Sequence, residues 1–339
     1  MAAAAATPLA HEKRPRAEDE EGLNNTPHVP KKHRASSQGD RNLWLYALGG
    51  QDGTNTVERC NPTTTTTTGK VVWKSAAPML SVRQAGTAAV VNGQLYAIGG
   101  DGYLNTKERD ERDKVSVCLN TMERYNVATN KWEHRAQMPV ARMDFAAATL
   151  RGHIYALGGV NGRPSTAVDR YDPTTDTWKS VAHMSTPRAR MAAVVVEDRL
   201  YALGGYGGFR PLNTVERYNP HTNTWEACAP MRTAQSLHAA AALNGHIYVV
   251  GSNGFTPTME RYDPTTNTWS SRCAPMKVAR YALGAAVIDG HLYAVGGDKV
   301  HADASNDVER YDPATDSWET IQSMRTARGS HAVAAVPHP

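Results

Sequence analysis

The sequence lacks the features that define several large classes of protein. Its four cysteines, Cys60, Cys118, Cys228 and Cys273, form no CxxC pair and no Cys/His ligand spacing, so neither a zinc site nor a disulfide framework is indicated. No segment approaches the roughly 20 apolar residues that cross a bilayer, and the N-terminal MAAAAATPLAHEKRPR does not follow the pattern of a secretory signal. A formal net charge of +4 does not demand a nucleic-acid partner. We expect an intracellular protein, nuclear or cytoplasmic, with neither a membrane nor a nucleic-acid partner.

Catalytic signatures are also missing. The chain contains no Gly-rich phosphate loop, no HExxH helix, no GxSxG elbow and no Cys/His cluster. Three of its histidines, His153, His246 and His291, recur at one turn position, which indicates turn chemistry rather than metal binding. The sequence therefore predicts no enzyme, no cofactor and no metal site.

Residues 1–40 differ in composition from the rest of the chain. They are rich in Ala, Pro and charged residues, with few large aliphatic side chains, so burial cannot offset the entropy of ordering them and we predict a disordered tail. Two basic clusters, KRPR and PKKHR, are candidates for a nuclear import signal, although a merely solubilising tail is the alternative. The candidate import residues are Lys13, Arg14, Arg16, Lys31, Lys32 and Arg34.

Residues 41–339 repeat one pattern. The recurring pattern is an apolar segment ending in Gly-Gly, a polar loop, a VERY-like segment, a DPTTNTW-like turn and then Pro-Met; one copy has lost its second glycine and carries Gly251-Ser252. The six copies are marked by Trp73, Trp132, Trp178, Trp225, Trp269 and Trp318. A fixed period of roughly 45 to 60 residues is typical of propellers.

Each copy reads as four short antiparallel strands. In the third copy, a small-residue strand at 146–150 turns into an apolar strand at 154–157, and a strand at 168–171 reverses into one that starts at Trp178. Small side chains suit a strand crowded at a central axis. The repeated Tyr and Trp are predicted to pack one unit against the next.

Gly-Gly followed by Tyr, with Trp about seven residues after that Tyr, resembles the kelch repeat. The P-M-x-x-x-R and V-E-R-Y-D-P variants are similar to the propellers of the kelch-like (BTB-kelch) substrate adaptors. The resemblance implies an all-β, six-bladed kelch β-propeller with four antiparallel strands per blade. Because 40 residues cannot encode the BTB/BACK modules of those adaptors, we expect a chain that either binds targets without delivering them to a ligase or competes with full-length adaptors.

The ends of the repeat predict how the ring closes. The first copy begins at LWLYALGG and has no small-residue first strand, whereas the chain ends on such a strand, SHAVAAV, at 330–336. Placed before Leu43, this segment would complete the first blade and pair the exposed sheet edge.

Functional residues are expected where the copies differ. A carboxylate or an arginine that recurs in every blade, such as Glu123 or Arg124, is predicted to be structural. In the resembling adaptors the partner surface is formed by the loops between strands two and three and between strand four and the next blade. Arginines and aromatics in these loops have the composition of interaction hot spots. The candidate partner-binding residues are Arg163, Arg188, Arg190, Tyr206, Phe209, Arg210, Phe255 and Tyr281.

Two hypotheses follow. The first is a monomeric protein-interaction module that binds a protein or an acidic peptide, with a role in substrate recognition or scaffolding in ubiquitin-ligase pathways. The second is a carbohydrate-acting kelch enzyme similar to the sialic-acid mutarotase, which would hold a small ligand near the axis. A plain, soluble loop surface remains the alternative to both.

Overall fold

The computed structural model describes residues 42–51, 54–63, 71–103, 116–252, 257–299 and 303–338. The chain divides into two units, residues 1–40 and residues 41–339. The first unit lies outside the described residues, and so do the predictions of disorder and of an import signal that were made for it.

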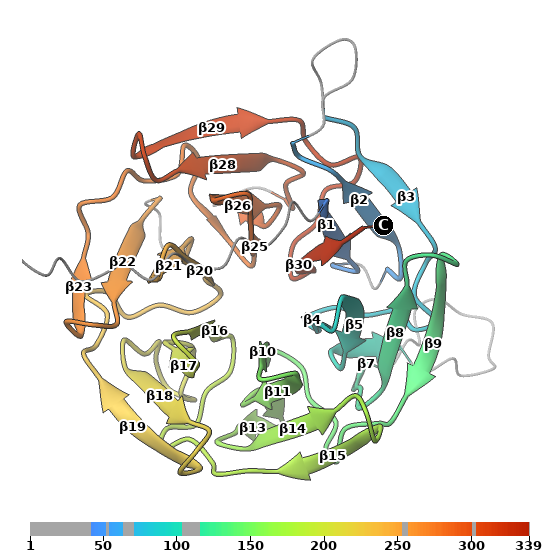
Figure 1. Ribbon diagram of the computed structural model, residues 1–339, viewed down its shortest axis with the longest axis horizontal. Helices are drawn as coiled ribbons and strands as arrows, with labels where there is room; N and C mark the ends of the chain where they lie inside the picture. The colour runs from blue at the N-terminus through green and yellow to red at the C-terminus, as the bar shows by residue number, and fades with distance from the viewer. Residues whose placement is uncertain are drawn as a thin grey trace, which may run out of the picture. The chain divides into compact units, whose positions relative to one another are not determined.

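Residues 41–339 form six four-stranded antiparallel sheets, which are the blades of a propeller (Figure 1). This confirms the predicted fold class. Blade 1 consists of β30 (Ala332–Pro337), β1 (Leu43–Leu48), β2 (Val57–Cys60) and β3 (Lys74–Ala76). Blade 2 consists of β4 (Thr87–Val91), β5 (Gln94–Ile98), β8 (Met122–Asn126) and β9 (Lys131–Arg135). Blade 3 consists of β10 (Ala146–Leu150), β11 (His153–Leu157), β14 (Val168–Asp172) and β15 (Thr177–Ser180).

The remaining blades have the same order of strands. Blade 4 consists of β16 (Ala192–Val196), β17 (Arg199–Leu203), β18 (Val215–Asn219) and β19 (Thr224–Cys228). Blade 5 consists of β20 (Ala239–Leu243), β21 (His246–Val250), β22 (Met259–Asp263) and β23 (Thr268–Ser270). Blade 6 consists of β25 (Gly284–Ile288), β26 (His291–Val295), β28 (Val308–Asp312) and β29 (Ser317–Ile321).

Three short pairs of strands lie outside the blades, in the connecting loops. They are β6 (Asp101–Tyr103) with β7 (Ser116–Cys118), β12 (Val160–Asn161) with β13 (Arg163–Pro164), and β24 (Arg280–Tyr281) with β27 (Asp298–Lys299). The third strand of blade 2 is β8, which pairs with β5 and continues into the turn that leads to β9.

The ring closes through the two ends of the unit. Strand β30 pairs antiparallel with β1 over the full register from Leu43↔Pro337 to Leu48↔Ala332. Figure 1 shows β30 beside β1, at the end of the chain that carries the C label. The predicted closure is confirmed. Strand β1 has a hydrogen-bonded neighbour on both of its edges, β30 and β2, so the edge that the first copy alone would expose is paired.

The core lies between the blades. Each repeated tryptophan donates its indole N–H to a carbonyl of the preceding blade, for example Trp132 to Ala77 over 2.9 Å and Trp178 to Ala136 over 2.9 Å. Tyrosines of neighbouring blades also meet edge to face, such as Tyr96 and Tyr171 with ring centroids 5.8 Å apart. Both observations confirm that the repeated aromatics pack blade on blade.

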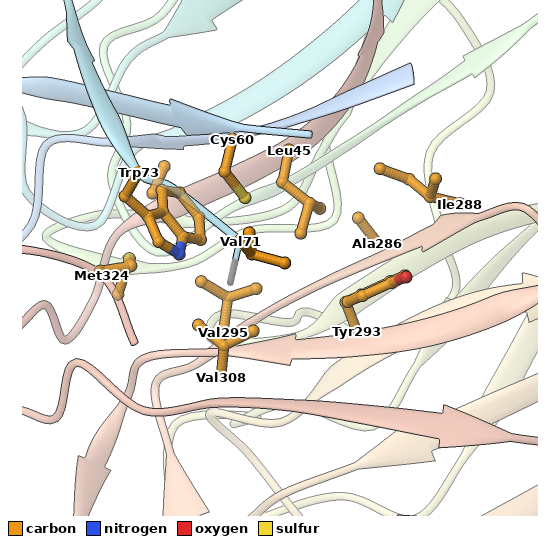
Figure 2. Close-up of a cluster of buried hydrophobic side chains, with 11 residues drawn as sticks. Leu45, Cys60, Val71, Trp73, Ala286, Ile288, Tyr293, Val295, Val308 and Met324 are labelled. Atoms are coloured by element: carbon orange, nitrogen blue, oxygen red, sulfur yellow. The ribbon is translucent and has the colours of Figure 1, made fainter. Parts of the chain in front are cut away.

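The seam between blades 6 and 1 shows how the packing adapts to one substitution. Cys60 stands where other blades carry the third-strand tyrosine, and it is buried with Leu45 and Trp73 against Tyr293 and Val295 (Figure 2). Burial raises the pKa of the Cys60 thiol, so it stays a neutral, small apolar group.

Candidate partner-binding surface

One face of the ring carries the loops that join strands two and three and the loops that join strand four to the next blade; we call it the loop face. On this face a series of short β-bridges runs from blade 3 to blade 5. The bridges are Met143↔Val160, Ser165↔Arg188, Ala189↔Tyr206, Tyr206↔Pro211 and Leu212↔Gln235. The loops of these blades are therefore held by backbone hydrogen bonds to one another, and they present their side chains from a structured layer.

Beneath this layer lies a set of buried arginines that the P-M-x-x-x-R motif encodes. Each guanidinium donates to the carbonyl of the first glycine of the next Gly-Gly pair and to a carboxylate of the same blade. Arg188 donates to Gly204 over 2.8 Å and to Glu216 over 2.9 Å. The other members of the set are Arg83, Arg142, Arg280 and Arg328, which pair with Glu123, Asp169, Glu309 and Glu58.

Arg188 is therefore not a surface residue, which corrects the expectation that it contacts a partner. Its side chain is 0% exposed. Desolvation lowers its pKa, and the hydrogen bond and the charge of Glu216 oppose this effect. The recurrence of arginine at this position was the signal of a structural role, by the same reasoning that applies to Glu123 and Arg124.

Blade 5 departs from this arrangement. Gln235 replaces the arginine, and its amide nitrogen lies 3.4 Å from the sulfur of Met231. The carboxylate of Glu260 is buried and accepts hydrogen bonds from the backbone N–H groups of Arg232 and Thr233. Within the described ranges, no side-chain cation pairs with Glu260.

At the axis a second ring of hydrogen bonds closes the mouth of the channel. Six residues, one from each junction between blades, have a positive φ and donate their N–H to the carbonyl of the preceding member. They are Ala85, Asp144, Arg190, Leu237, Ala282 and Ser330. This geometry places the predicted site residue Arg190 at the axial mouth, where its Nε donates to Asp144 Oδ2 over 2.9 Å. Its charge is thus already compensated.

Two histidines line this mouth, and the sequence did not point to either of them. His238 and His331 are 5% and 7% exposed, and neither ring nitrogen of His331 has a hydrogen-bond partner among the residues that the structure describes. Desolvation lowers the pKa of His238 to about 4 and that of His331 to about 3. Both imidazoles are therefore neutral at pH 7. Below the mouth, small residues of the six inner strands line a channel of about 310 Å³.

The three remaining well-described candidates lie together on the loops of blades 3 and 4. Arg163 is exposed in the β12–β13 hairpin, and Phe209 and Arg210 are exposed in the loop after β17. Phe209 is 98% exposed. The two loops touch, because a Cβ on Gly208 would lie 3.9 Å from Pro164 Cγ. Nowhere in the described ranges does an acidic side chain pair with Arg163 or Arg210.

The other predicted residues divide into two groups. Tyr206 and Tyr281 are partly buried: the Tyr206 hydroxyl donates to the carbonyl of Gly208 over 2.9 Å, and Tyr281 pairs with Asp298 in the β24–β27 ladder. These contacts of Tyr206 and Tyr281 hold their loops in place. Phe255 lies outside the described residues.

A groove of about 420 Å³ adjoins Arg163. Its lining includes Val140, Asn161, Arg163, Pro164 and Pro187. Val140 is 48% exposed, so it offers apolar surface at the groove. The volume falls in the range of sites that take a ligand or a peptide side chain.

The described residues contain no group of three or more His, Cys, Asp or Glu side chains arranged to hold a metal ion. Among the same residues, no helix is long and apolar enough to traverse a bilayer.

Comparison with known proteins places the fold in a family. The profile of the KLHDC2/KLHL20/DRC7 Kelch-repeats domain matches residues 22–205. The Kelch motif matches residues 187–232, 236–276 and 279–325. A likeness in fold alone is found with the solved structure of YjhT, at a TM-score of 0.71 and 15% identity over 84% of this chain and 95% of that chain.

Similar proteins include several with kelch-like names. Kelch-like protein 9 of Mus musculus is 34% identical over 26% of this chain and 13% of its own length. Kelch-like protein 33 of Homo sapiens is 32% identical over 35% of this chain and 20% of its own length. The human Influenza virus NS1A-binding protein is 36% identical over 27% of this chain and 13% of its own length. The chain thus spans a fifth or less of these relatives, but one family profile covers more than half of it and the structure has six kelch blades, so this protein belongs to the kelch-repeat family.

Proposed function

We propose that this chain is a protein-interaction module that binds a partner through the loop face of blades 3 and 4. The observation that carries the proposal is Phe209, an almost fully exposed aromatic side chain next to Arg210, on a loop that neighbours the hairpin of Arg163; within the described residues neither arginine pairs with an acidic side chain. Exposed aromatics beside arginine are typical of the few residues that dominate binding energy. A side chain of this kind has no role in the packing of its own blade.

The charge of the surface favours an acidic partner. Three other arginines around these loops each form an ion pair with a carboxylate of the protein, which compensates their charge: Arg142, Arg188 and Arg190. Arg163 and Arg210 contribute two uncompensated positive charges. Each guanidinium can form a bidentate contact with a carboxylate or a phosphate.

The relatives' names suggest the biological setting. Kelch-like protein 9, Kelch-like protein 33 and a Kelch repeat and BTB domain-containing protein of Danio rerio share parts of this sequence. We extend this to substrate recognition or scaffolding in a ubiquitin-ligase pathway, by a monomer in the nucleus or the cytoplasm. The carbohydrate-acting alternative gains no comparable support, because the likeness to YjhT is one of fold alone.

The proposal is tested by proximity cross-linking from the loop face. A photo-crosslinker placed at Asn161, on the exposed hairpin, should capture a discrete set of proteins in cells. Capture should fall at least fivefold in the variant Arg163→Glu/Arg210→Glu. A crosslinker placed at Lys131, on the opposite turn face, serves as the control. Equal capture from both positions, or capture unaffected by charge reversal, would contradict the proposed function.

A further inference from the structure

We infer that the groove beside Arg163 takes an apolar side chain of an extended, acidic segment of the partner, with Arg163 and Arg210 binding the flanking carboxylates. The inference rests on the proposed function and names the chemistry of the partner at that site. It therefore assigns different tasks to three parts of one surface: a largely apolar groove, two cationic contacts and the exposed aromatic side chain of Phe209 on the neighbouring turn.

The groove is built and not merely a gap between mobile loops. The β12–β13 hairpin is held on one side by Val160, whose N–H donates to Met143 over 2.8 Å, and on the other by Ser165, whose carbonyl accepts from Arg188 over 3.0 Å. Gly162, with φ at 83°, forms its turn. The lining residues are consequently in place before any partner binds, which lowers the entropic cost of binding.

The backbone turn that carries Phe209 and Arg210 is also held in a defined conformation. Phe209 lies at the tip of a tight turn that Gly207 and Arg210 close with a backbone hydrogen bond of 3.2 Å. Gly208 precedes it with φ at 107°, a backbone conformation that residues with a side chain rarely adopt. The Tyr206 hydroxyl then fixes the turn through the Gly208 carbonyl. At Gly208 the turn lies beside Pro164, which belongs to the lining of the groove, so Phe209 and Arg210 follow directly after the point where the turn approaches the groove.

The chemistry of the lining selects the occupant. Apolar side chains, among them Val140, Pro164 and Pro187, line much of the groove beside the polar Asn161, Ser165 and Thr166. An apolar side chain therefore buries its surface there, whereas a charged side chain would lose part of its hydration. The rim carries Arg163, and Arg210 lies on the neighbouring turn; neither has an acidic partner on these loops. An aliphatic side chain between acidic residues satisfies both requirements, whereas a basic segment is repelled.

The test uses defined peptides and the full chain. Fluorescein-labelled EELLEE, EESSEE and KKLLKK hexapeptides, each extended by Gly-Ser, are titrated into the protein and followed by fluorescence polarisation. We expect EELLEE to bind at least tenfold more tightly than EESSEE, and KKLLKK not to bind. Two variants, Val140→Glu and Arg163→Glu/Arg210→Glu, should each weaken EELLEE binding at least tenfold.

Matched controls come from the repeat itself. Leu80 is an exposed apolar side chain in the corresponding loop of the preceding junction, one position before the equivalent of Val140; it is 52% exposed, but it does not line the groove. Leu80→Glu and Lys131→Glu/Lys179→Glu should therefore leave the dissociation constant within twofold. The melting temperature of every variant is first compared with that of the wild type. If Val140→Glu unfolds, the milder Val140→Ser replaces it.

The outcomes separate this inference from the proposed function. If EELLEE binds no better than EESSEE or KKLLKK, or if Leu80→Glu weakens it as much as Val140→Glu, the inference is overturned. Should cross-linking from Asn161 still depend on Arg163 and Arg210 in that case, the proposed function stands and only the chemistry assigned to the groove is wrong. Loss of both results would overturn both.

Discussion

Arg328 donates a hydrogen bond to Glu58 across 3.1 Å, although the two residues stand 270 positions apart in the chain. The backbone N–H groups of Arg325 and Thr326 donate to the same carboxylate. The equivalent pair between blades 1 and 2 is Arg83 with Glu123. The seam at which the ring closes is therefore joined by the same buried ion pair as an ordinary seam, in addition to the pairing of β30 with β1.

Removal of the closing strand should unfold the ring as a whole. Deleting residues 330–339 removes β30, exposes the inner edge of β1 and takes away Ala334 and Val336 from the seam between blades 1 and 2. We expect the melting temperature to fall by more than 10 °C, since losing several kcal/mol shifts the midpoint by about 2–4 °C per kcal/mol in a domain of this size. Calorimetry checks the change.

Deleting residues 1–36 is the control for the C-terminal deletion and should leave the melting midpoint unchanged. A C-terminal deletion that melts like the full chain would contradict the role of β30.

Substitution of Arg188 should lower the free energy of unfolding strongly, whereas substitution of Arg163 should hardly change it. Arg188→Leu leaves the buried Glu216 carboxylate without its cation and should lower the free energy of unfolding by about 3–5 kcal/mol. Arg163→Leu removes an exposed side chain and should change it by less than about 0.5 kcal/mol. Urea denaturation measures both. If Arg188→Leu were as stable as wild type, the structural role assigned to the buried arginines would fail.

Restoring the missing arginine in blade 5 should stabilise the protein. Gln235→Arg would place a guanidinium near the buried Glu260, where hydrogen bonds between charged groups contribute about 1.5–3 kcal/mol. We expect the urea midpoint to rise. The double variant Gln235→Arg/Glu260→Gln is the control, because it keeps the larger side chain but removes the charge. A gain that persists in the double variant would show that packing, not pairing, is responsible.

Stability should fall with acidification because of the histidines at the axial mouth. In the folded protein, desolvation, followed for His331 by the charges of Arg328 and Arg280, lowers the pKa of His238 to about 4 and that of His331 to about 3. The unfolded chain has the ordinary pKa of about 6.5, so it binds more protons between these values and pH 6.5. Stability is thus fully present above pH 6.5 and is lost as the pH falls, by up to about 1.4 kcal/mol per pH unit for each histidine.

Substitution of each histidine tests this dependence. Three of the other four junctions carry Phe145, Met191 and Leu283 at the same position and the fourth carries Gly86, so His238→Leu and His331→Leu are replacements that the repeat already accommodates. Each should flatten the plot of unfolding free energy against pH between 4 and 6.5. His246, at a turn with its Nδ1 beside the carbonyl of Asn244, is the control, and His246→Leu should leave the slope unchanged. An unchanged slope in both axial variants would show that other groups cause the acid sensitivity.

The repeat made most of the architecture predictable from the sequence. Six spaced tryptophans, the Gly-Gly pairs and the small-residue strands sufficed for the number of blades, their strand order and the closure of the ring by the last strand. This was possible because each blade is built by local turns, and because a blade cannot bury both faces without neighbours. The structural role of Glu123 and Glu216 also followed from their recurrence, since a side chain required at every seam belongs to the scaffold.

Exposure was decided only by the tertiary structure. Arg163, Arg188 and Arg190 look alike in the sequence as loop arginines, yet one is free on a hairpin, one is buried under Gly204 and one is paired at the axis. Their environments are set by contacts with other blades, which the local sequence does not encode. The histidines of the axial mouth are neutral only because six blades converge there and burial removes water from their rings. The groove beside Val140 likewise forms only where the loops of neighbouring blades meet.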